Sequence, residues 1–146
     1  MTNAIDDAIA RLQDLAQACT SVTIKSAPDY PVSNAEPAPF TIAHLASAMG
    51  VVEGAGAMKF LAVAHVDFYF SLVNLKQAYQ QLDLIALEYM QRLGGDPTLN
   101  GKVSTIKFSE GDSPTCEDAG AVPWGSVPFH MLRFVIPFKI LTTTTT

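Results

Sequence analysis

Several features typical of membrane, redox or nucleic-acid-binding proteins are missing from this sequence of 146 residues. Its longest apolar run falls well short of the roughly 20 residues that a membrane-spanning helix needs. The N-terminus lacks a basic start followed by an apolar segment, so we expect no export signal. Cys19 and Cys116 are the only cysteines, and we expect free thiols rather than a disulfide or a metal site. These absences favour a soluble, non-exported protein.

Positive charge is also scarce. The chain has 9 Lys and Arg, scattered singly, against 14 Asp and Glu, for a formal net charge of -5. Binding to phosphates requires clustered Lys or Arg that displace counterions, so we exclude a nucleic-acid-binding surface. An acidic surface would instead suit a protein past which DNA moves without being held.

Apolar residues make up 49% of the chain, enough to bury one core. We expect a single α+β domain over residues 1–141, followed by a tail of threonines at 142–146. The clearest pattern lies at the centre, where residues 59–72 alternate between apolar and polar side chains and predict a half-buried strand. Asn74 then caps a predicted helix from Leu75 to Leu93, and Gly94 is expected to end it in the left-handed conformation.

Further elements are predicted on both sides of this centre. Asn3 can cap a first amphipathic helix that reaches Cys19. Residues 40–47 form a strand that a glycine-rich turn at 50–56 joins to the central strand as a hairpin. Residues 102–108 and 127–141 are two closing strands, and Pro137 makes the last one an edge strand or marks a bulge. The expected fold is a largely antiparallel four-stranded sheet with two helices packed on one face, plus long loops at 26–39 and 109–126.

No residue pattern indicates catalysis or metal binding. His44, His65 and His130 lie on separate predicted strands without the spacing of converging metal ligands. His65 and Asp67 share a strand face and would suit a base with its orienting carboxylate, but no nucleophile signature accompanies them. We therefore favour a solvated strand face, and predict no catalytic, cofactor-binding or metal site.

Two leucines of the second helix depart from its apolar stripe. Leu84 and Leu87 fall well off that stripe, and few charges lie between Asp83 and Glu88. Either the same chain covers these leucines through a broad buried face or a loop, or a neighbouring subunit occupies this second helix face. Both interpretations stay open at the level of sequence.

The end of the second helix carries a resemblance to a known family. Arg92-Leu93 is followed by Asp96-Pro97-Thr98-Leu99-Asn100-Gly101-Lys102-Val103. With the order of elements over nearly the whole chain, this resembles the tail terminator, or tail completion, proteins of long-tailed bacteriophages. In that family the helix typically ends with a phrase of the type Asp-Pro-Thr-Leu-Gly-Gly-x-Val that leads into a strand. This chain has Asn100 where the phrase has Gly, and its segment 109–126 is longer than expected.

The resemblance implies a structural virion protein without catalysis or cofactors. Such proteins form hexameric rings in the phage neck that cap the tail tube, end tail polymerisation and mediate head–tail joining. The implied partners are further copies of the chain, the tail tube protein, head–tail connector proteins and, as a further candidate, the tail sheath. Genome DNA passes the lumen without specific binding, and the ring is assembled in the host cytoplasm.

A closed ring needs two different contact patches on each subunit. The candidate interface residues are Leu84 and Leu87, with the loops around Asp29-Tyr30-Pro31 and Pro123-Trp124. One alternative is a head–tail connector or stopper protein of the neck with a similar build. An alternative of another class is a small α+β enzyme or ligand-binding domain that uses a pocket between sheet and helices.

Overall fold

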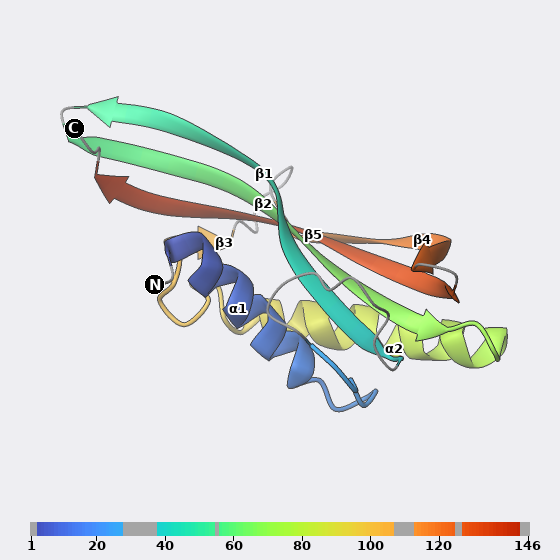
Figure 1. Cartoon of the computed structure of the whole chain (residues 1–146). Helices are drawn as coiled ribbons and strands as arrows, with labels where there is room; N and C mark the ends of the chain where they lie inside the picture. The colour runs from blue at the N-terminus through green and yellow to red at the C-terminus, as the bar shows by residue number, and fades with distance from the viewer. Residues whose placement is uncertain (1–2, 28–37, 55, 107–112, 125–126, 144–146) are drawn as a thin grey trace.

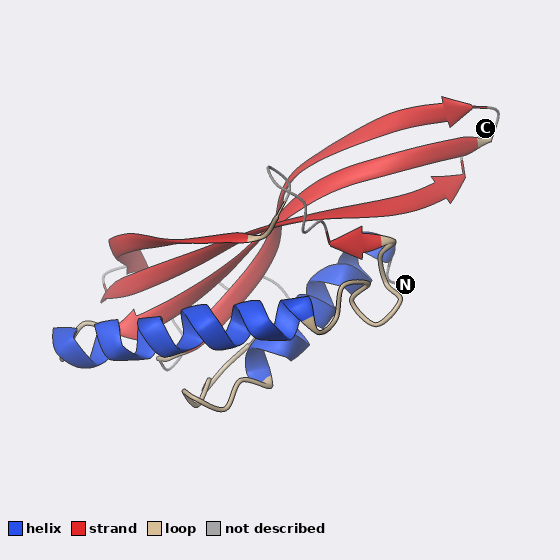
Figure 2. Cartoon of the chain, turned by 180° about the vertical axis from the view of Figure 1, so that it is seen from behind, coloured by secondary structure: helices blue, strands red, loops and turns tan. Residues whose placement is uncertain are grey.

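The computed structural model describes residues 3–27, 38–54, 56–106, 113–124 and 127–143. They form an α+β fold in which a five-stranded antiparallel sheet packs against two helices. Both helices lie on the same face of the sheet (Figures 1 and 2). The elements are α1 (Ala4–Gln17), β1 (Phe40–Gly54), β2 (Ala57–Ser71), α2 (Leu75–Gly94), β3 (Thr105–Ile106), β4 (Thr115–Trp124) and β5 (Val127–Thr143).

The last strand, β5, is the centre of the sheet. It pairs with β2 on one side, and with β3 and β4 at different heights on the other, while β1 pairs with β2. The expected count of four strands is therefore wrong, because β4 lies within the segment predicted as a loop. No side chain of β4 is fully buried, and only Val122 and Trp124 near its end pack against an apolar cluster, so pairing with β5 is what holds most of this strand. The alternating pattern that signals a strand is accordingly absent from its sequence.

The central position of β5 contradicts the expectation that Pro137 marks an edge strand or a bulge. The pairing of β5 with β2 runs past Pro137 without a register shift. The N–H of Ser104 donates to the Lys139 carbonyl at 2.8 Å, so the backbone groups of Lys139 face away from β2. Residues two apart along a strand direct their backbone groups to the same side, and Pro137 therefore also faces away from β2. On that side the described partners are β3 at Lys139 and β4 at Val135, and neither faces Pro137. The missing proline N–H therefore leaves no gap in a described ladder.

The element boundaries differ from expectation at three places. Gly50 lies inside β1, because the strands of the hairpin continue to Gly54 and from Ala57. At the same end of the sheet, β5 continues through Thr142 and Thr143, which pair with Met58 and Ala57 of β2. Of the predicted strand at 102–108, only Thr105–Ile106 is strand among the described residues.

Both helix starts are confirmed, and the end of α2 is not as expected. Asn3 and Asn74 each accept a hydrogen bond from the backbone N–H three residues on. Gly94 is the last helical residue, and Gly95 caps α2 with an ordinary right-handed φ of -81°. The left-handed residues come in the next turn, where Asn100 has a φ of 56°. Because Asn tolerates this conformation better than most residues, Asn100 fits where the family phrase has Gly. Neither helix of the described chain is long and apolar enough to cross a membrane.

Two apolar clusters lie on opposite faces of the sheet. The main core fills the space between helices and sheet, and there the Tyr89 hydroxyl donates to the Leu12 carbonyl at 2.9 Å. Phe68 belongs to this core, so Tyr69, the next residue of β2, points to the other face. There it packs in a second cluster with Phe40, Ile42, Phe129 and Met131. The central strand is thus buried on both faces near its end, rather than half-buried throughout.

One end of the sheet projects beyond the helices (Figures 1 and 2). We call this part the arm; it comprises residues 45–54 of β1, 57–64 of β2 and 136–143 of β5. The registers place these three segments side by side, with Leu45 opposite Ala64 and Ala64 opposite Ile136. Along β1, every residue from 45 to 50 is exposed. The β1 part of the arm therefore lacks the cover that the helices give the rest of the sheet, whereas Ala62, Ala64, Ile136 and Phe138 of the arm are buried in the main core.

Candidate functional site

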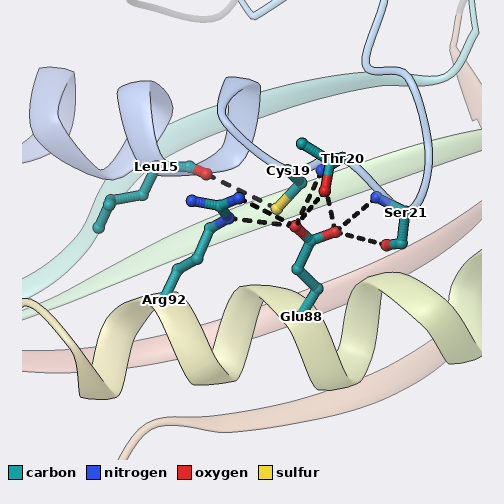
Figure 3. Close-up of polar contacts among 6 residues, drawn as sticks. All are labelled: Leu15, Cys19, Thr20, Ser21, Glu88 and Arg92. Carbon is teal, nitrogen blue, oxygen red and sulfur yellow. Dashed lines mark hydrogen bonds and ion pairs between the residues drawn. The ribbon is translucent and has the colours of Figure 1, made fainter.

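A carboxylate on α2 fixes the segment that follows α1 (Figure 3). Glu88 accepts hydrogen bonds from the backbone N–H groups of Thr20 and Ser21, each at 2.8 Å, and from both of their hydroxyls. Arg92, one turn further along α2, donates to the same carboxylate at 3.1 Å. Residues 20 and 21 thereby become a fixed rim beside the exposed side of α2.

These contacts change the acidity of two neighbouring groups. Burial raises the pKa of Glu88, but the hydrogen bonds from Ser21, Thr20 and Arg92 outweigh it and lower the pKa to about 2. Burial, followed by the charge of Glu88, raises the pKa of Cys19 to about 11, so its thiol stays protonated at neutral pH. Both cysteines are free, as expected, with Cys19 buried and Cys116 exposed on β4. Within the described residues, no group of three or more His, Cys, Asp or Glu is placed to hold a metal ion.

We expect Glu88→Gln to destabilise the fold by roughly 1 to 2 kcal/mol at neutral pH, since hydrogen bonds to an ionised group are stronger than neutral ones. The pKa of Glu88 falls from 4.5 to about 2 on folding, so its contribution is complete above pH 4.5 and is lost as the pH falls toward 2. Urea unfolding at several pH values measures this difference. A stability gap between wild type and variant that stays constant from pH 6 to pH 2 would contradict this assignment.

The outer face of α2, formed by Gln80, Asp83, Leu84, Leu87 and Gln91, points away from the sheet. Leu84 is 49% and Leu87 64% exposed, so no element of the described chain covers them. For the described residues, this argues against the interpretation that their own chain buries them. Two hollows of about 550 Å³ and 820 Å³ adjoin this face, and both are lined by Ser21, Gln80 and Leu84. The rim fixed by Glu88 thus borders a concave surface in which Leu84 and Leu87 are exposed among polar side chains.

The other predicted interface residues lie elsewhere or outside the described residues. Asp29, Tyr30 and Pro31 fall outside the described residues. Pro123 and Trp124 end β4, where Pro123 pairs with Pro128. The Trp124 ring packs edge-on against Tyr69, with 5.1 Å between ring centroids, and so contacts the second apolar cluster. The structure does not bring Pro123 and Trp124 together with Leu84 and Leu87 in one patch.

A charged network lies on the sheet face opposite the helices. Asp67 is only 2% exposed, and Arg133 donates to both of its carboxylate oxygens, at 2.8 and 3.0 Å. His44 stands 3.7 Å from the same carboxylate, and burial, then the Arg133 charge, lower the pKa of His65. The expectation of a solvated face is wrong for Asp67, which is buried and paired. Because Arg133 occupies the carboxylate, Asp67 is not free to orient His65 as a base.

The two outermost long strands of the sheet have very different edges. On β4 the edge carries Glu117, Asp118 and Pro123, and a register shift follows Asp118. On β1 no Asp, Glu, Lys, Arg or Pro occurs from Phe40 to Val52, although one register shift lies after Leu45. Charges, prolines and bulges are the devices that stop an exposed strand from pairing with another chain. The sequence pattern predicts a strand at β1 but not at β4, and it does not show which strand lies at an open edge, so this feature was not predicted.

Comparison with known proteins gives no assignment. No family model and no curated protein sequence matches this chain. The function must therefore be inferred from the surfaces of the fold and from the phrase that follows α2.

Proposed function

We propose that this chain is a structural protein of the bacteriophage virion that forms a hexameric ring in the neck or tail. The ring caps the tail tube, ends its polymerisation and mediates head–tail joining. The observation that carries this proposal is the presence of two uncovered surfaces on different parts of one chain, the outer face of α2 and the β1 edge. Identical copies that close into a ring contact each other heterologously, and so each copy needs two different patches.

The turn after α2 supports the proposal independently. Asp96 accepts hydrogen bonds from Arg11 of α1, at 2.8 Å, and from the backbone of Asn100, at 2.8 Å. Leu99 is fully buried in the core. The residues of the family phrase therefore have specific structural roles in joining α2 to α1 and to β3. A phrase whose residues hold the fold together in this way favours a fold shared with tail terminators. The proposed function rests on that resemblance and not on the fold alone.

The charge of the chain suits a ring around a DNA passage. With a formal charge of -5 and no clustered basic residues, a ring of six copies would repel the phosphates of DNA in its lumen. We place the protein in the virion, with the tail tube protein and head–tail connector proteins as its partners and the tail sheath as a further candidate. We propose no enzymatic activity, which accords with the engagement of Asp67 by Arg133.

A tube-capping assay tests this function. Purified protein is added in substoichiometric amounts to the polymerising tail tube protein of the phage that carries this chain, and tube lengths are measured by electron microscopy. We expect growth to stop, with a ring visible at one tube end. Unchanged tube growth, combined with binding to portal–adaptor complexes, would contradict the terminator function and favour a head–tail connector.

A further inference from the structure

We propose that the outer edge of β1, over residues 43–52, is completed by an extended segment of a second copy of this chain. This inference rests on the self-association proposed above and names the surface and the type of contact. The proposed contact uses backbone hydrogen bonds of β1, whereas the contact proposed for the outer face of α2 uses side chains.

The fold itself covers only the start of this edge. The N–H of Thr41 donates to the Ser26 carbonyl at 3.0 Å, and the N–H of Lys25 donates to the Pro39 carbonyl at 2.8 Å. The Gln13 side chain donates to the Thr41 carbonyl at 3.1 Å. From residue 43 onward, the described chain offers β1 no backbone partner other than β2. The edge thus accepts an extended segment at its beginning and, as far as the described residues go, continues unpaired into the arm.

The unpaired part is chemically suited to pairing. Ala46, Ala48 and Gly50 are small and exposed, so another backbone can approach closely. Among its larger side chains, Met49 is 58% and Val52 69% exposed, and a paired strand would bury part of this apolar surface. Strand addition of this type takes its affinity from main-chain hydrogen bonds and its specificity from alternating side chains.

Charge favours a second copy as the occupant. The chain is acidic, so two copies repel each other over most of their surface. The β1 edge is a long strip without Asp, Glu, Lys or Arg side chains, where two acidic copies can meet at little electrostatic cost. A basic partner would find no carboxylate along residues 40–52 to recognise, and the acidic β4 edge would repel a second copy. The uncharged strip therefore fits this chain better than a strongly charged partner.

Hydrogen exchange and a matched pair of lysine variants test the inference. In wild type, the amides of residues 43–52 should exchange about tenfold more slowly in the assembled protein than after dilution to monomers. Ala48→Lys should raise the concentration needed for assembly by about tenfold or more, because it places a charge at the joined edge. Ala121→Lys, an exposed alanine of β4, is the control and should leave assembly unchanged. Thermal unfolding of dilute samples checks that both variants fold.

Three results would overturn the inference. If Ala48→Lys assembles at the same concentration as wild type, and the amides of residues 43–52 still exchange fast in the assembled protein, the β1 edge is not a subunit contact. The proposed ring would then remain, but without this contact. Equal protection of these amides in the dilute monomer would mean that the chain covers its own edge. A wild-type protein that stays monomeric, even at tube ends, would remove both this inference and the proposed ring. If Ala48→Lys does not fold, the wild-type exchange comparison decides alone.

Discussion

Leu84→Asp is expected to prevent ring closure while leaving the fold intact. Leu84 is half-exposed between the two hollows on the outer face of α2, so a carboxylate there stays hydrated in the isolated chain. In an interface, the same carboxylate would lose its hydration without a cationic partner. Loss of a central apolar contact costs roughly 2 kcal/mol or more, which is at least about 30-fold in affinity at each of the six contacts. Size-exclusion chromatography with light scattering measures the loss of assembly.

A matched variant separates the position from the added charge. Ala4→Asp introduces the same charge on an exposed residue at the start of α1, outside both hollows. We expect this control to assemble like wild type, and both variants to unfold at nearly the same temperature. A Leu84→Asp protein that forms complete rings would show that the outer face of α2 is not a subunit contact.

Arg133→Met is expected to have the largest effect on stability, a loss of about 3 kcal/mol. Removing one partner of a buried ion pair costs about 3 to 5 kcal/mol, because the other charge stays buried without compensation. We expect the lower end of this range, since the Arg133 side chain is 30% exposed and water can reach part of the site. His44 lies 3.7 Å from the Asp67 carboxylate and compensates only part of the loss. Chemical denaturation at pH 7 gives the free energy of unfolding.

The double variant Asp67→Leu, Arg133→Met provides the control. It removes both charges, so most of the lost stability should return if the cost comes from the unpaired carboxylate. The remaining pair-specific energy follows from the double-mutant cycle. If Arg133→Met costs less than about 1 kcal/mol, the buried pair does not stabilise the sheet in the way proposed.

Local sequence signals predicted much of the fold. The alternation around Phe68 and the three-and-four spacing after Leu75 gave the central strand and α2, since each depends on neighbours within a few residues. The caps Asn3 and Asn74 were predicted for the same reason. The α+β class and the hairpin of β1 and β2 followed from the order of these elements.

The features that sequence did not predict depend on distant parts of the chain. The strand β4 has no fully buried side chain, and most of it is held by its pairing with β5. The ion pair of Asp67 and Arg133 joins residues 66 positions apart, so no local spacing indicates it. Leu84 and Leu87 were singled out as irregular, but only the packing of the other elements shows that they are exposed. The open edge of β1 likewise depends on which strands lie beside it.

The central claim is that this chain closes into a ring of six, and the mass of the native assembly tests it most directly. Native mass spectrometry, with negative-stain images of the same sample, should give six times the chain mass of 15.7 kDa and a ring with a central opening. The measurement should be made on the protein alone and again with tail tube ends, because docking can promote assembly. A monomer under both conditions, or a closed dimer without a lumen, would contradict the proposed ring.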